Sequence, residues 1–149
     1  MKLKIIIFCI IIFYSFFNTI YASNDTHTYE VVDYTIPKPL TSNIGDPVKG
    51  LEIVISREGN CLACHNIPNI DDLFQGNIGP SLAGVGNRYT IAELRLRLVN
   101  PYVLNSDSLM PAFYKVNGLI RVDKKYIGES ILSAQQIEDV ISWLITLKK

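Results

Sequence analysis

The sequence has 149 residues, which is enough for a single domain, and its 14 Lys and Arg residues balance its 14 Asp and Glu residues. A chain without net positive charge lacks the electrostatic signature of a nucleic-acid-binding protein. With only three cysteines, it also lacks the disulfide framework that stabilises many small exported domains.

Residues 1–22 have the pattern of a secretory signal peptide. Two lysines open the segment, residues 5–17 are apolar, and Ala22 ends a short cleavage site. The alternative is an uncleaved membrane anchor, for which the apolar run is short because a span needs about 20 residues. We therefore expect a periplasmic protein that is cleaved near Ala22 and has no permanent membrane anchor.

Residues 23–44 are predicted to form an extended arm, since the segment is polar and carries Pro37 and Pro39. Its apolar side chains are interleaved with polar ones too closely for a simple linker; they are Tyr29, Val31, Val32, Tyr34, Ile36 and Leu40. Two interpretations stay open. The arm packs on a partner protein and orders on binding, or it folds back over the surface of its own chain.

Residues 45–149 are predicted to form one mainly α-helical domain. Its first helix begins at Asp46, because Asp is a good N-cap and Pro47 suits the first helical position. We expect this helix to run to about Glu58 and to stop at Gly59.

Cys61-Leu62-Ala63-Cys64-His65 has the Cys-x-x-Cys-His spacing by which c-type haem is attached. Two intervening residues let one tight turn bring both thiols to the two vinyl groups of a porphyrin, while the next imidazole can bind the iron. The motif predicts one haem c, covalently held through Cys61 and Cys64, with His65 as an iron ligand. Covalent attachment takes place outside the cytoplasm, which agrees with the predicted export.

Three alternatives use the same cysteines. A thioredoxin-like redox motif needs a βαβ context, which the flanking sequence lacks. A zinc site needs four ligands, and beyond residue 22 the chain offers Cys61, Cys64, His65 and only the remote His27. A disulfide between Cys61 and Cys64 would close a small, strained loop and add little stability.

Two further helices are predicted from capping boxes. Thr90 with Glu93 opens a helix that ends before Pro101, and its apolar stripe consists of Ile91, Leu94 and Leu98. Ser133 with Gln136 opens the last helix. The apolar face of that helix consists of Ile137, Val140, Ile141 and Leu144, extended by Leu147.

The connections between the helices are predicted to be irregular. Gly79-Pro80 begins a loop that continues through Gly84 and Gly86. Residues 116–131 show no clear periodicity, so we expect an irregular loop with a short strand at most.

Beyond the predicted signal peptide the chain has a single methionine, Met110, in a loop of residues 100–111. A lone methionine usually fills a gap in a core. However, an iron with one histidine ligand commonly takes a thioether on its other face in electron-transfer cytochromes. Met110 is therefore predicted as the second iron ligand, with Pro111 stiffening the backbone after it. The rival nitrogen ligand, His27, lies in a polar tail.

Three arginines could hydrogen-bond the haem propionates, since guanidinium groups suit carboxylates. Arg88 follows the loop glycines and is the better candidate. For Arg95 and Arg97 a solvated helix face is the favoured interpretation.

Several of these features together resemble the class I cytochrome c family; they are Gly50, the haem motif, Gly79-Pro80, Met110 and Trp143. The resemblance implies a mainly α fold with helices packed around one covalently bound haem. It implies that the first and last helices cross at right angles, with Gly50 allowing close approach and Trp143 packing there. It also implies that Pro80 offers its backbone carbonyl to the ring of His65.

A narrower set of segments resembles the SoxX family, the monohaem cytochrome subunits of SoxAX complexes of thiosulfate oxidation. The segments are Ile36-Pro37-Lys38-Pro39-Leu40-Thr41, Gly45-Asp46-Pro47, Gly59-Asn60-Cys61-Leu62-Ala63-Cys64-His65, Gly79-Pro80-Ser81-Leu82, Met110-Pro111-Ala112-Phe113-Tyr114 and Ile131-Leu132-Ser133-Ala134-Gln135-Gln136. This resemblance covers nearly all of the chain beyond residue 22.

The SoxX resemblance implies a non-catalytic electron-transfer subunit of a heteromeric L-cysteine S-thiosulfotransferase. A SoxA-like haem subunit would be the partner and would carry the sulfur chemistry, joining thiosulfate oxidatively to a cysteine of a SoxY-like carrier protein. This chain would take up the electrons and pass them to a soluble cytochrome. Two other functions stay open: a free-standing periplasmic electron carrier unrelated to sulfur, and a haem enzyme with an open iron position.

Overall fold

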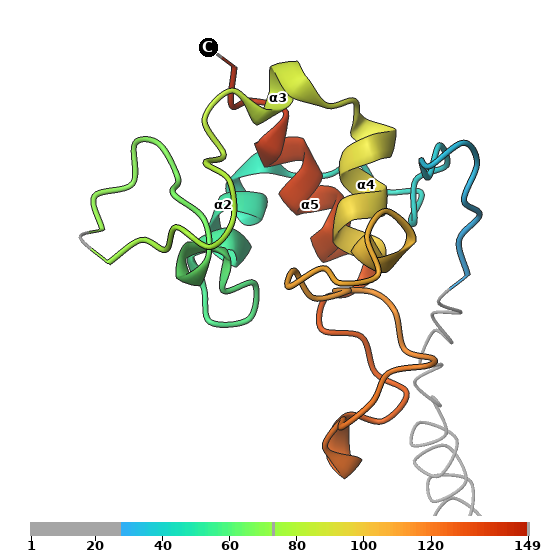
Figure 1. Cartoon of the computed structure of the whole chain (residues 1–149). Coiled ribbons are helices and arrows are strands. Elements are labelled where there is room, and N and C mark those ends of the chain that lie inside the picture. The colour runs from blue at the N-terminus through green and yellow to red at the C-terminus, as the bar shows by residue number, and fades with distance from the viewer. Residues whose placement is uncertain (1–27, 73, 149) are drawn as a thin grey trace, which may run out of the picture.

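The computed structural model describes residues 28–72 and 74–148 (Figure 1). The predicted signal peptide, His27 and the first residues of the predicted arm lie outside the described residues. The elements are α2 Pro47–Ile55, η1 Cys61–Ala63, α3 Val85–Arg88, α4 Ile91–Val99, η2 Pro101–Val103, η3 Lys124–Tyr126 and α5 Ala134–Leu144. The described part of the chain forms no strand beyond an isolated bridge between Val32 and Thr35, which confirms the mainly α fold. None of its helices is long and apolar enough to span a bilayer.

Helices α2 and α5 pack against each other at the centre of the fold (Figure 1). They come very close at Gly50, where an added Cβ would stand 2.0 Å from the backbone oxygen of Asp139 and 2.9 Å from Cβ of Trp143. Only glycine, which has no Cβ, leaves room for this contact. The contact between Gly50 and Trp143 that the cytochrome c resemblance implies is therefore present.

The helices begin where their sequences predict. The side chain of Asp46 accepts hydrogen bonds from two amides in the first turn of α2. Thr90 and Glu93 form a complete capping box at the start of α4, and Ser133 and Gln136 form another at the start of α5. Each cap satisfies amides that have no partner inside the helix.

Helix α2 ends at Ile55, earlier than the predicted end near Glu58. The reason is the side chain of Ser56. Its hydroxyl donates to the carbonyl of Ile53 at 2.8 Å and accepts from the amides of Glu58 and Gly59 at 3.2 and 3.3 Å. A serine that bonds to nearby backbone groups in this way competes with the continuation of the helix.

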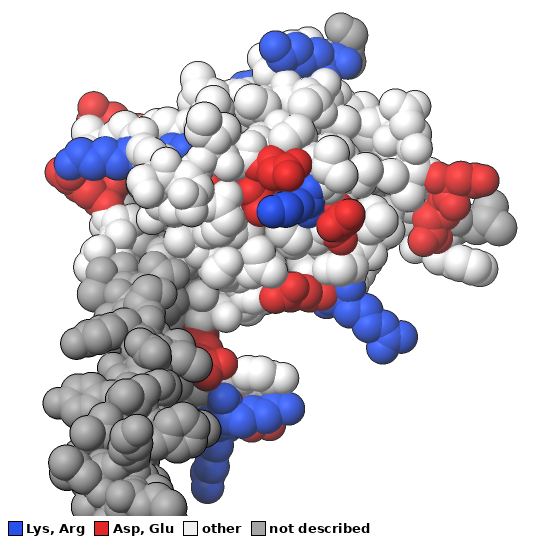
Figure 2. All heavy atoms as spheres, turned by 180° about the vertical axis from the view of Figure 1, so that it is seen from behind, with Lys and Arg blue, Asp and Glu red and all other residues white. Residues whose placement is uncertain are grey.

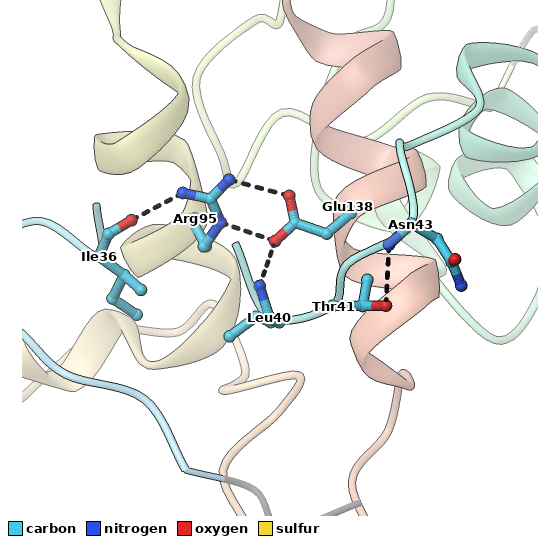
Figure 3. A network of polar contacts seen from close by, with 6 residues as sticks. All are labelled: Ile36, Leu40, Thr41, Asn43, Arg95 and Glu138. Carbon is cyan, nitrogen blue, oxygen red and sulfur yellow. Dashed lines mark hydrogen bonds and ion pairs between the residues drawn. The ribbon is translucent and has the colours of Figure 1, made fainter. Parts of the chain in front are cut away.

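Helix α4 buries a different face from the predicted one. Leu94 and Leu98 are in the core as expected, but Ile91 is 45% exposed. Arg95 is only 4% exposed, so the prediction of a solvated position is wrong for this residue. Its guanidinium donates to both carboxylate oxygens of Glu138 on α5, at 2.7 and 2.9 Å (Figure 3). The opposite charge of Glu138 is what allows Arg95 to be buried.

The described part of the predicted arm, residues 28–44, packs on its own chain. Ile36 is 1% exposed, and its carbonyl accepts from Nη1 of Arg95 at 2.7 Å. The amide of Leu40 donates to Oε1 of Glu138 at 2.9 Å (Figure 3). The arm therefore folds back on its own chain at Ile36 and Leu40, because the ion pair between α4 and α5 binds its backbone at both positions. Contact of its exposed side chains with a partner stays a prediction.

The backbone of Phe113 joins the two ends of the long connection between α4 and α5 by hydrogen bonds. Its amide donates to the carbonyl of Leu98, and its carbonyl accepts from the amide of Leu132, both at 2.9 Å. Residues 115–131 then leave the body as a projecting loop (Figure 1). Its only regular element is the short turn η3, as predicted for this segment.

Candidate haem site

The Cys-x-x-Cys-His motif folds into one compact turn. Asn60 enters the turn in the left-handed conformation (φ 49°, ψ 31°), and Cys61–Ala63 form η1. The amides of Cys64 and His65 both donate to the carbonyl of Cys61, at 3.1 and 2.9 Å. Both cysteines are free thiols and are half-buried, so the disulfide alternative is not the arrangement found in this structure.

The ring of His65 is oriented by the loop that follows the motif. Its Nδ1 lies 2.7 Å from the carbonyl oxygen of Pro80. Because a carbonyl can only accept, Nδ1 carries the proton in this hydrogen bond, and the lone pair for a metal is on Nε2. Gly79 lies against the same ring, where an added Cβ would come within 2.4 Å of Cε1. The contact implied by the cytochrome c resemblance is therefore present, and it fixes the ligand orientation.

Backbone hydrogen bonds pin the Gly79-Pro80 loop to the haem motif. The amide of Gly79 donates to the carbonyl of Cys64 at 2.7 Å, and the amide of Gly76 donates to a carbonyl within η1 at 2.8 Å. Gly76 has no room for a side chain, since a Cβ would stand 2.1 Å from the carbonyl oxygen of Ala63. This role could not be predicted from the sequence, because a glycine in a loop has no local signal for such a contact.

The side chain of Arg88 forms hydrogen bonds with the turn that follows Gly79-Pro80. Its Nη2 donates to the carbonyl of Ser81 at 2.9 Å, and its Nη1 donates to the carbonyl of Ala83. The guanidinium thus supports the segment that presents a carbonyl to His65. The hydrogen bond from Arg88 to a haem propionate stays a prediction.

Met110 lies in the connection between η2 and Phe113. Its side chain is half-buried and packs against the core. Its amide donates to the hydroxyl of Ser108 at 3.2 Å, and that hydroxyl donates back to the carbonyl of Met110 at 3.4 Å. This small turn holds the backbone at the position of the predicted second ligand.

The thiol of Cys61 is held in its neutral form. Burial raises the pKa of Cys61 to about 11; a backbone hydrogen bond opposes this effect, and the nearby Cys64 adds to it. A thiol that stays protonated at neutral pH is a weak nucleophile and a weak metal ligand. Cys61 is therefore protonated at neutral pH.

The donor set of this site fits a c-type haem. It comprises two thiols on one turn, an imidazole whose Nδ1 is engaged, and a half-buried thioether on a separate loop. The same segments leave Phe74, Ile78 and Leu109 largely exposed, as expected of side chains that a large apolar ring would cover. Within residues 28–72 and 74–148, no three His, Cys, Asp or Glu side chains cluster so that they could hold a metal ion.

The family model for cytochrome c matches residues 49–148. The chain therefore belongs to the cytochrome c family, and its fold is that of a class I cytochrome c. Within this family it is similar to a chain of the crystal structure of SoxXA from P. pantotrophus, with 39% sequence identity and a TM-score of 0.74. The similarity covers 81% of this chain and 95% of that chain, which confirms the SoxX resemblance. A comparison with curated proteins finds no match.

Replacing Met110 with Ala should remove the second iron ligand. We expect the weak near-infrared sulfur-to-iron band of the oxidised, haem-loaded protein to disappear, and the reduction potential to fall, because a thioether ligand favours Fe(II). Ile44→Ala is the control, since Ile44 is an exposed apolar residue outside the segments of the haem site. An unchanged band in Met110→Ala would exclude Met110 as the ligand.

Proposed function

We propose that this chain is the electron-transfer cytochrome subunit of a SoxXA-type sulfur-oxidising complex in the periplasm. The observation that carries the proposal is the similarity to the SoxXA chain, which extends over 95% of that chain at 39% identity. The match to the cytochrome c family model, residues 49–148, includes the haem motif, Met110 and helices α3 to α5. The partner implied by the proposal is a SoxA-like haem subunit.

The residues of this chain have distinct parts in that function. Cys61 and Cys64 would hold one haem covalently, and His65 and Met110 would be its iron ligands. When bound, the haem supplies reversible one-electron chemistry. The carbonyl of Pro80 keeps the Nδ1 proton of His65 in place, so that Nε2 is always directed to the metal. With two iron ligands supplied by its own side chains, the chain would carry electrons rather than bind a substrate at the metal.

The sulfur chemistry is assigned to the partner. Joining the sulfane sulfur of thiosulfate to a cysteine thiol of a SoxY-like carrier forms one S–S bond and releases one proton and two electrons. This chain would accept the electrons one at a time and pass each to a soluble cytochrome. It would therefore be the electron-accepting, non-catalytic subunit of an L-cysteine S-thiosulfotransferase.

Reconstitution tests this function directly. The oxidised, haem-loaded chain is mixed with a SoxA-like subunit, a SoxY-like carrier and thiosulfate, and its reduction is followed by absorbance. We expect reduction only when all components are present and none when the carrier cysteine has been alkylated. Reduction by thiosulfate alone would favour the haem-enzyme alternative. Failure to bind or be reduced by the SoxA-like subunit would favour a free-standing carrier.

A further inference from the structure

The projecting loop, residues 115–131, exposes several large apolar side chains. Ile120 is 86% exposed, Ile127 is 69% exposed and Tyr126 is 53% exposed, and Val122 and Ile131 are also exposed. Soluble monomers rarely keep so many apolar side chains uncovered in one contiguous segment, and such patches mark interaction sites. These exposed side chains are not part of the described core. The two ends of the connection are already joined by the backbone hydrogen bonds of Phe113.

The same loop carries a net positive charge. It carries four cations and two acids, namely Lys115, Arg121, Lys124, Lys125, Asp123 and Glu129. Since the whole chain is balanced in charge, the remainder is net acidic. Figure 2 shows Lys and Arg side chains gathered at the lower edge of the molecule, where the loop projects in Figure 1.

The cations of the loop have no acidic partners within the described residues. The two ion pairs of that part of the chain join Lys38 to Glu30 and Arg95 to Glu138. In the loop, the ammonium of Lys125 instead lies 4.6 Å from the ring centre of Tyr126. The loop therefore combines apolar anchors with an unneutralised cationic rim, the composition of a protein interface with its partner removed.

Local hydrogen bonds give the loop a defined shape. The side chain of Asp123 accepts from the amide of Lys125 at 3.1 Å, and the amide of Tyr126 donates to the carbonyl of Asp123 at 2.9 Å. The amide of Glu129 then donates to the carbonyl of Tyr126 at 3.1 Å. A loop ordered in this way loses less conformational entropy on binding.

We propose that the projecting loop docks on an acidic, apolar-centred face of the SoxA-like subunit. This inference rests on the proposed function and adds the surface that holds the complex together. The similar chain comes from a structure of SoxXA, and a lasting interface between two proteins needs apolar anchors at its centre. The exposed isoleucines supply the anchors, and the unpaired Arg121 and Lys124 select an acidic rim.

Binding of haem-loaded variants to the SoxA-like subunit, measured by titration calorimetry, tests the proposal. In the first variant, Arg121, Lys124 and Lys125 are all changed to Gln. We expect affinity to fall about tenfold at low salt, and the loss to shrink at high salt because screening weakens the wild-type attraction. In the second variant, Ile120→Ser with Ile127→Ser, we expect at least about a tenfold loss at every salt concentration.

A control variant with the same change in net charge shows whether a loss of affinity depends on the position of the cations in the loop. Lys49, Arg57 and Lys148 are exposed cations outside the loop, and changing all three to Gln should leave affinity near the wild-type value. All variants change exposed side chains, so their melting temperatures should match the wild type. If the wild-type chain does not bind the SoxA-like subunit, the proposed function fails; if it binds and the loop variants bind equally well, only the docking proposal fails.

Two further measurements test whether the loop binds something other than the SoxA-like subunit. Sedimentation of the wild-type chain with vesicles of phosphatidylcholine and phosphatidylglycerol tests for a lipid surface, and analytical ultracentrifugation tests for a second copy of this chain. The docking proposal expects neither vesicle binding nor self-association. If either occurs and is abolished by the loop variants, while their binding to the SoxA-like subunit stays intact, the proposal is overturned.

Discussion

Glu138→Gln is expected to destabilise the haem-loaded protein by about 3–5 kcal/mol, because it leaves the buried guanidinium of Arg95 without a counter-charge. Both side chains are almost fully buried, and two hydrogen bonds join them. A glutamine has the same shape, and its carbonyl oxygen can still accept from the amide of Leu40. Its amide nitrogen would face Nη2 of Arg95, which is also a donor, so the loss combines the missing charge with one lost hydrogen bond. Urea unfolding followed by far-ultraviolet circular dichroism gives the free energy of unfolding.

Two control variants show whether burial of the ion pair causes the loss of stability. Lys38→Met breaks the exposed ion pair with Glu30 and should cost at most about 1 kcal/mol. The double variant Arg95→Met with Glu138→Leu removes both charges and should recover part of the loss, since apolar pairs can replace buried ion pairs. Recovery is not complete because the carbonyl of Ile36 and the amide of Leu40 lose their partners. A loss below about 1 kcal/mol in Glu138→Gln would contradict the importance of this pair.

The starts of the helices could be predicted from the sequence because their signals are local. Asp46-Pro47 and the two capping boxes each act within three residues, so no knowledge of the tertiary fold is needed. The end of α2 could not be placed as well. It depends on the rotamer of Ser56, whose hydroxyl bonds to the backbone on both sides.

The burial of Arg95 and the docking of the arm could not be predicted because their partners are remote in sequence. Arg95 and Glu138 are 43 residues apart, and Leu40 and Glu138 are 98 apart. An arginine on a helix is usually solvated, and a Pro-rich segment usually extends. Only the approach of α4 and α5 creates the site that binds the backbone of Ile36.

The haem motif and the predicted iron ligand His65 could be recognised from spacing alone, because both thiols and the imidazole lie on one turn. The contacts that orient His65 could not be recognised from spacing. The contact of Pro80 with His65 is implied by the family resemblance, whereas no sequence signal points to the hydrogen bonds of Arg88 with the carbonyls of Ser81 and Ala83. Such contacts depend on how a loop returns to the motif, which the sequence does not encode locally.

Gly50→Ala is expected to destabilise the protein by about 3 kcal/mol through overpacking between α2 and α5. Helix propensity predicts the opposite sign, since Ala is preferred over Gly within a helix by about 1 kcal/mol. The tertiary contact outweighs this preference. The new Cβ would stand 2.0 Å from the backbone oxygen of Asp139, so the two helices must separate and weaken the framework that positions the haem motif.

Gly128→Ala is the control for a glycine outside such a crossing. Its φ of +85° is unfavourable for alanine, but no atom lies within 4 Å of the added Cβ, so the cost should be only the backbone strain of about 1 kcal/mol. Urea unfolding of both haem-loaded variants gives the comparison. If Gly50→Ala unfolds no more easily than Gly128→Ala, the close approach of α2 and α5 at Gly50 is not what requires glycine there, and the packing of α5 on α2 must tolerate a wider separation than the structure shows.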